Sequence, residues 1–177
     1  MDAIEPNGSA VDRRDLRAGD EAGFVAELGR RLQLEGLPVD RLILHQRTMH
    51  PEILARAVAW APHEPVEIYD RDHGLELSEN FGSSPLHRVM ETGEPLAVHL
   101  APNEDRVWTW SPWLRRRNLV ELLILPIGNA EGPVCTLTIG TAHPGGFGPD
   151  DKQALARIEL CLRMPMKRPW RRTRRGT

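Results

Sequence analysis

Cysteine, lysine and long apolar runs are all scarce in this chain of 177 residues. Its two cysteines, Cys135 and Cys161, are too few for a disulfide framework or, by themselves, for a zinc site. No stretch approaches the roughly 20 apolar residues that cross a bilayer, and the start, MDAIEPNGSAVDRRD, lacks the charged-then-apolar order of a signal peptide. We therefore expect a cytoplasmic protein without a membrane span.

Charge is divided unevenly along the chain. The formal net charge is −2, but residues 165–177 hold six basic side chains and no acidic one. Without those six, 17 basic residues stand against 25 acidic ones, a net charge of −8. We expect residues 165–177 to be a basic, disordered tail and residues 1–19 a flexible lead, with one domain at 20–164. No folded nucleic-acid motif accompanies the tail, so we expect no specific nucleic-acid binding.

Hydrophobic spacing divides the domain into helices and strands. Apolar residues recur at helical spacing near both of its ends, and period-2 runs lie between. The predicted elements are a helix at 20–36, strands at 41–49, 52–60 and 64–72, a helix at 84–93, a strand at 96–100, a short helical segment at 111–118, strands at 119–128 and 132–141, and a helix at 150–164. Sequential strands that can pair through hairpins, with terminal helices to cover one face, favour an antiparallel α+β structure.

Two helix starts carry capping signals. Ser84 is a predicted N-cap with Pro85 at the first helical position, and Gly93 ends that helix. The glycine-rich corner TAHPGGFGPDD could suggest a phosphate loop, but its spacing matches neither G-x-G-x-x-G nor G-K-[ST]. Asp150 and Asp151 would also repel a phosphate at this helix start. We interpret the corner as a strand-to-helix cap.

Four segments together resemble a GAF domain: GLPVDRLILHQRTMHPEILARAVAW, SSPLHRVMETGEPLAVHL, LVELLILPIGNAEGPVCTLTIGT and HPGGFGPDDKQALARI. More closely, they resemble the GAF-like regulatory region that precedes the catalytic domain in many bacterial class III adenylate/guanylate cyclases. The resemblance covers about residues 20–164. It implies a central antiparallel sheet of about five to six strands, with the N- and C-terminal helices packed on one face. It also implies a ligand-sized cavity under short helices and loops on the other face.

The chain departs from that family at two places. The family commonly enters the penultimate strand through a Gly-Thr-Asp-Tyr-like sequence, whereas this chain has RNLVELLILP. In such cyclases the last helix runs on into a connector and a cyclase domain, whereas here Pro165 and the basic tail follow. The expectation is a free-standing sensor module, or a shortened cyclase relative, without a cyclase domain.

Candidate ligand-binding residues come from one strand and from the tryptophans. His45 and Arg47 share one face of the predicted central strand, where Arg47 could hold an anion and His45 could respond to pH; alternatively, both face solvent or a partner. The three tryptophans at 108–113 lie in the segment that covers the cavity in GAF folds, where they line a pocket or pack on the sheet. The candidates are His45, Arg47, Trp60, Trp108, Trp110 and Trp113.

Metal and redox chemistry have weaker support. The seven histidines are scattered without the spacing of a pre-formed metal site, so we assign no metal or cofactor. Cys135 alternates with Leu137 and Ile139, and Cys161 lies beside the inward stripe of the last helix, so both are expected to be small core residues. In bilin-attaching GAF domains the cysteine is followed by His, whereas neither cysteine of this chain is.

We therefore expect a non-catalytic GAF-like sensory or regulatory domain. It would bind a small molecule or a protein partner and signal through its terminal helices, which would also form a homodimer. The alternative is a small GAF-fold redox enzyme of the free methionine sulfoxide reductase type, which requires accessible thiols that can form a disulfide.

Overall fold

A computed structural model describes residues 21–47, 53–72, 82–100, 118–128 and 135–163 of the chain. The elements are α1 (Glu21–Leu34), β1 (Arg41–Arg47), β2 (Ile53–Trp60), β3 (Glu67–Asp72), α3 (Pro85–Thr92), β4 (Leu96–His99), β5 (Glu121–Ile127), β6 (Cys135–Thr141) and α5 (Pro149–Arg163). No helix within the described ranges is long and apolar enough to cross a membrane. The helical segment predicted at 111–118 falls almost wholly outside the described residues.

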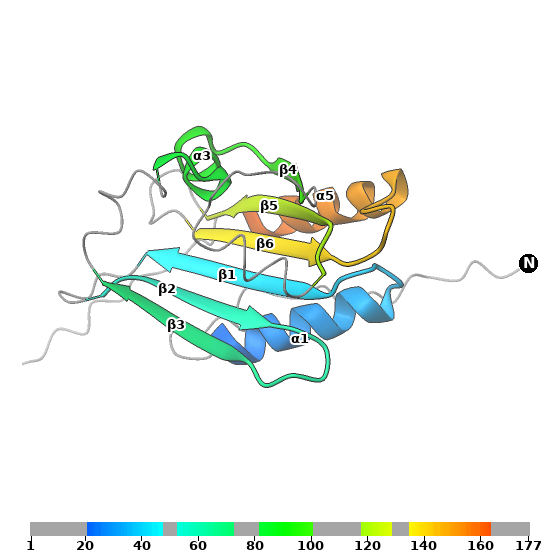
Figure 1. Cartoon of the computed structure of the whole chain (residues 1–177), viewed down its shortest axis with the longest axis horizontal. Coiled ribbons are helices and arrows are strands. Elements are labelled where there is room, and N and C mark those ends of the chain that lie inside the picture. Colours follow the sequence, from blue (N-terminus) through cyan, green and yellow to red (C-terminus); the bar gives the residue numbers. More distant parts are fainter. Residues whose placement is uncertain (1–20, 48–52, 73–81, 101–117, 129–134, 164–177) are drawn as a thin grey trace, which may run out of the picture.

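The six strands form one antiparallel sheet in the order β3-β2-β1-β6-β5-β4 (Figure 1). Strands β1 and β6 lie at its centre and pair with each other although they come from opposite ends of the domain, with Leu42 opposite Ile139 and Leu44 opposite Leu137. The remaining pairs are sequence neighbours. The predicted α+β class, the meander and the hairpin are confirmed, and β1 is a central strand as predicted.

Helices α1 and α5 cover the same face of the sheet. The main apolar core joins Leu28 and Leu32 of α1 to Leu155 of α5 and to Leu44 and Leu137 of the central strands. Each of these side chains is at most 2% exposed. Full burial of one leucine contributes about 1.5–3 kcal/mol, so this core is the main source of stability for the helix-covered face. The predicted placement of both terminal helices on one face is confirmed.

Helix α1 buries more residues against the sheet than residues 149–159 of α5 do. Within α1, Gly29 lies so close to Trp60 of β2 that a Cβ atom there would be 2.3 Å from Cε3 of the indole. Among residues 149–159 of α5, Leu155 is the only buried residue. The buried residues of α1 are Phe24, Val25, Leu28, Gly29 and Leu32.

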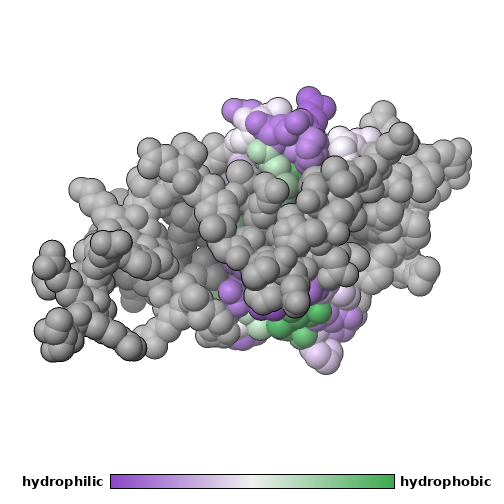
Figure 2. Space-filling model, turned by 90° about the vertical axis from the view of Figure 1, so that its left-hand side faces the viewer, coloured by the Kyte–Doolittle hydropathy of each residue, from purple (hydrophilic) through white to green (hydrophobic). Residues whose placement is uncertain are grey.

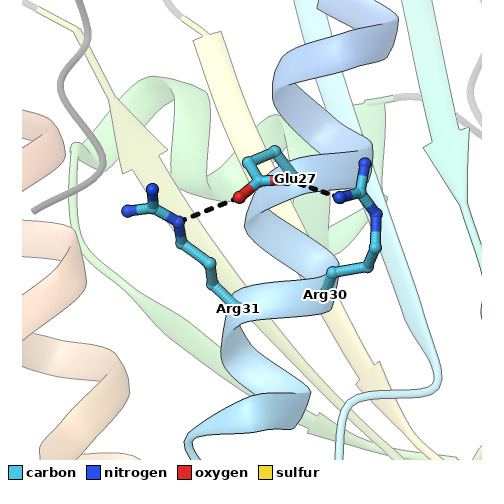
Figure 3. Close-up of polar contacts among 3 residues, drawn as sticks. All are labelled: Glu27, Arg30 and Arg31. Carbon is cyan, nitrogen blue, oxygen red and sulfur yellow. Dashed lines mark hydrogen bonds and ion pairs between the residues drawn. The ribbon is translucent and has the colours of Figure 1, made fainter. Parts of the chain in front are cut away.

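On the outer side of α1, Glu27 pairs with two arginines of the same helix. Arg30 and Arg31 both donate hydrogen bonds to its carboxylate (Figure 3). Pairs of this kind on an exposed helix surface contribute only about 0.5 kcal/mol each. The position of α1 on the sheet is therefore set by its buried face.

Helix α3 packs against the half of the sheet formed by β4, β5 and β6. The Ser84 hydroxyl accepts a hydrogen bond from the His87 N–H, and Pro85 occupies the first turn. Gly93 ends the helix in the left-handed conformation with φ of 67°, and its N–H donates to the Val89 carbonyl. The predicted cap, first-turn proline and terminating glycine of this helix are all confirmed.

The edge strands of the sheet are β3 and β4. Viewed from the end, the described surface is hydrophilic at the top, toward α3, with a small hydrophobic patch at the bottom, toward β3 (Figure 2). On β3, Ile68 is exposed and follows Glu67 directly, with Asp70 two positions further on. Charged residues around an exposed apolar residue disfavour pairing of this edge with another strand.

Candidate functional site

The sheet face opposite α1 and α5, here termed the second face, carries His45, one of the predicted site residues. Side chains alternate along a strand, and Leu42 and Leu44 of β1 point into the main core. Arg41, Ile43 and His45 therefore lie on the second face, whereas the side chain of Arg47 lies outside the described part of the structure. A smaller apolar cluster that includes Ile43 packs there, and His45 is half-buried.

Two buried hydroxyl groups on the second face lack a hydrogen-bond partner among the residues that the structure describes. Thr136 and Thr138 of β6 are 0% and 2% exposed. Within the described part of the chain, neither Oγ1 atom has a partner. Leaving a buried hydroxyl unpaired costs about 1–3 kcal/mol, and most buried polar groups in proteins are paired. These two residues can therefore bind polar groups that the described chain does not supply.

The strand register brings these hydroxyls beside His45. In the β1–β6 pair, His45 lies opposite Thr136 and Ile43 lies opposite Thr138. Residues directly opposite in an antiparallel pair have Cβ atoms about 4.5–5.5 Å apart, so the imidazole and the Thr136 side chain are neighbours. His45, Thr136 and Thr138 thus form a polar strip at the centre of the second face.

A buried arginine, which the sequence analysis missed, lies near one end of this face. Arg41 is 1% exposed, and its Nη2 is 2.7 Å from Oε2 of Glu67. Its Nη1 is 3.9 Å from Oε2 of Glu64. A buried guanidinium requires such compensation, since removing one partner of a buried pair leaves an uncompensated charge. The contact ties β1 to the edge strand β3 across β2.

On the helix-covered face, Glu121 is a fully buried carboxylate that the sequence analysis also missed. Its Oε2 accepts a 2.7 Å hydrogen bond from the Phe147 N–H. Its Oε1 is 2.9 Å from Nζ of Lys152 and 3.6 Å from Nε2 of His99. Burial alone would raise the pKa of Glu121, but Lys152 and the Phe147 N–H outweigh that effect, so the pKa lies below its ordinary value. The carboxylate is therefore ionised at neutral pH.

The glycine-rich corner at 142–148 folds around this carboxylate. Gly146 has φ of +68°, and a Cβ atom there would be 2.3 Å from Oε2 of Glu121. Gly148 donates its N–H to Oδ2 of Asp151 over 2.8 Å, which caps the start of α5. Two backbone N–H groups that a phosphate would need are thus bound to the chain's own carboxylates. The interpretation of the corner as a cap is confirmed.

The structure separates the predicted site residues. His45 lies on the second face, but Trp60 lies opposite Leu42 and belongs to the main core under α1. Trp60 therefore cannot share a cavity on the second face with His45, because the sheet lies between them. Its indole instead packs against Gly29, where α1 contacts β2. The other three candidates, Trp108, Trp110 and Trp113, lie outside the described residues.

An open hollow of about 490 Å³ lies away from the polar strip. It is formed where α1 ends and β1 begins, and by the residues that follow β6. Its walls include Gln33, Leu37, Asp40 and His143. The Gln33 side chain donates to the Val39 carbonyl, and Asp40 accepts from the Ala142 N–H, so these two polar groups are engaged within the fold.

Comparison with solved structures identifies the type of fold. No protein-family model and no curated protein matches the chain. The GAF domain of a two-component sensor histidine kinase from Bacillus halodurans is similar, with a TM-score of 0.54 at 16% identity, over 75% of this chain and 86% of that one. The fold is GAF-like. The GAF domain region of a putative membrane protein from Geobacter sulfurreducens gives 0.52 at 11% identity, over 80% and 92% of the two chains.

A third similar structure is the phycocyanobilin-bound GAF domain from a cyanobacterial phytochrome, with a TM-score of 0.51 at 14% identity, over 85% of this chain and 84% of that one. At these low identities the structural likeness shows the GAF-like fold alone. The chemistry of the site rests on the chain's own residues, and among those described the polar strip is the candidate ligand-binding feature.

Proposed function

We propose that the chain is a non-catalytic sensory or regulatory domain that binds a small polar molecule on the second face of its GAF-like sheet. The observation that carries the proposal is the pair of buried, unpartnered hydroxyls of Thr136 and Thr138 beside His45. A ligand that hydrogen-bonds to both hydroxyls would recover their desolvation cost. Arg47 follows His45 by two residues, and if it shares the face of His45, as the sequence predicts, it would favour an anionic group on that ligand.

The proposed output is a shift in the packing of the terminal helices. Strand β6 carries the hydroxyls on one face and Leu137 and Ile139 on the other, where they contact the core shared by α1 and α5. A ligand that prefers one position of β6 would favour one arrangement of those helices. A homodimer formed through α1 and α5, or a partner protein bound to them, would receive that change. Association with a nucleotide cyclase is a finer proposal that rests on the sequence resemblance.

The test compares ligand-induced thermal shifts of matched variants. The wild type is screened against nucleotides, hemes and small metabolites, and each hit is repeated on Thr136→Val/Thr138→Val and on Thr141→Val. Thr141 lies on the same strand but faces the helices, opposite Glu121. A ligand should raise the melting temperature of the wild type and Thr141→Val and have a much smaller effect on the double variant. Equal shifts in all three proteins would place binding elsewhere.

A redox enzyme remains the second candidate, because Cys135 is a half-buried cysteine at the start of β6. It packs against the main core beneath the helices, away from His45. A peroxidatic or resolving thiol must be accessible to substrate and to a second thiol. We expect Cys135 to react slowly with a thiol reagent in the native protein, with Cys135→Ser identifying its share of the signal. Rapid native-state labelling of two thiols, with disulfide formation on oxidation, would favour the enzyme.

A further inference from the structure

Helix α5 is held on the sheet by few apolar contacts near its start. Leu155 is its only buried residue among 149–159, Ala154 and Ile158 are partly buried against the core, and Phe147, just before the helix, contributes to the same core. Helix α1, by contrast, buries five residues and interlocks with Trp60. The first turn of α5 therefore depends more on polar contacts than α1 does.

Those polar contacts converge on Glu121. Lys152 meets its carboxylate from within the first turns of α5, a region of a helix that favours acidic residues and disfavours cations. Asp150 and Asp151 follow that preference, and Lys152 does not. The chain has only two lysines among its 23 basic residues, so a lysine at this position is not explained by composition. The buried carboxylate of Glu121 explains it.

We infer that the Glu121 carboxylate is a charge-dependent latch for helix α5. Ionised and paired with Lys152, it holds the corner at 142–148 and the first turn of α5 on the sheet; neutralised, it releases them while the sheet stays folded. The two carboxylate oxygens make different contacts, since Oε2 accepts a hydrogen bond from the Phe147 N–H and Oε1 forms an ion pair with Lys152. The close approach of Gly146 to Oε2 means that a displaced carboxylate also displaces the corner.

The charged groups around the latch come from two elements besides its own strand. From α5 the near cation is Lys152, and from β4 it is His99, whose side chain is 75% exposed. On β6 the residue opposite Glu121 is the uncharged Thr141. In the corner, His143 accepts the Gly145 N–H through Nδ1. Lys152 is thus the main compensating charge at neutral pH.

The sign of the pH dependence follows from this arrangement. The pKa of Glu121 is lowered from its ordinary value of about 4.5, so the ionised latch stabilises the folded corner above that value. This stabilisation is lost as the pH falls through the lower, folded-state pKa. Without Lys152, the pKa of Glu121 is still raised by burial but is lowered by the Phe147 N–H and His99 alone, so the latch should open at a higher pH than in the wild type.

Backbone hydrogen exchange in the full chain tests the latch, with rates corrected for the intrinsic pH dependence of exchange. The variants are Lys152→Met, Lys152→Arg and Arg157→Met, the last removing an exposed cation from the same helix. Lys152→Met should speed exchange of the Phe147 amide, and of the amide of residue 152 that donates to the Gly148 carbonyl, roughly tenfold at pH 7, the equivalent of one pKa unit. The amides of β1 and β6 should be unaffected, and Lys152→Arg should restore most of the protection.

Glu121→Gln provides a second measurement. Its amide oxygen can still accept the Phe147 N–H, but it carries no charge for Lys152, so exchange of the Lys152 amide, which donates to the Gly148 carbonyl, should be fast and independent of pH between 7 and 4. If that variant does not fold, the Lys152 series decides. The latch is refuted if Lys152→Met matches Arg157→Met, or if β1 and β6 lose protection together with α5.

Discussion

Replacing the two unpartnered threonines of the second face by valine should stabilise the ligand-free protein. Thr136→Val and Thr138→Val each keep the shape of the side chain and exchange a buried hydroxyl without a partner for a methyl group. The relieved desolvation is about 1–2 kcal/mol per site. For a chain of this size that corresponds to a rise in melting temperature of about 3–6 °C per substitution. Valine also suits a strand.

Thr141→Val is the matched control for this prediction. It makes the same change on the same strand, but Oγ1 of Thr141 accepts a 3.1 Å hydrogen bond from the His143 N–H. Losing that bond at a fully buried position should cost about 1 kcal/mol. Calorimetry on the three single variants would measure the contrast. If Thr136→Val and Thr138→Val destabilise the protein as much as Thr141→Val does, the two hydroxyls are paired in the folded protein and the reasoning fails.

Three further substitutions test how the helices are placed. Gly29→Ala should destabilise by about 1–3 kcal/mol in urea titration despite the gain of about 1 kcal/mol in helix propensity, because the new methyl meets Trp60; a neutral result would mean that the indole can move away. Gly146→Ala should cost about 2 kcal/mol or more through its positive φ and the contact with Glu121, and unchanged stability would contradict the geometry of the corner. Ser84→Ala should cost about 1 kcal/mol, measured in the same way, and a loss below about 0.3 kcal/mol would show that the cap bond is dispensable.

Local signals predicted much of the fold. The N-cap Ser84, the following proline and the terminating Gly93 define α3 through contacts within a few residues of one another, so the sequence contains the whole cause. Period-2 alternation likewise placed His45 on the face away from Leu42 and Leu44, because burial of one face fixes the alternation along a strand.

The elements that the sequence did not reveal depend on contacts between distant segments. Glu121 stands in an almost wholly apolar run, and its partners Phe147 and Lys152 come from a corner and a helix that only the folded sheet brings near. The face that holds Trp60 is set by the register of β2 on β1, which composition does not encode. A signal did exist for Thr136 and Thr138, which alternate with Leu137 and so mark a polar side of an otherwise apolar strand.

Strand β6 links the two features that carry the proposals. Its hydroxyls lie on the second face, and its end leads directly through the corner at 142–148 into α5. A ligand that displaces β6 along its length would therefore pull on the Phe147 N–H bond to Glu121. If ligand binding and the latch are coupled, thermodynamic linkage requires that closing the latch changes the ligand affinity by the same factor by which the bound ligand changes the latch equilibrium. Lys152→Met should then change the affinity for any ligand of the second face although Lys152 lies on the opposite side of the sheet, whereas Arg157→Met should not. Unchanged affinity in a variant with a loosened α5 would show that the latch and the site are independent.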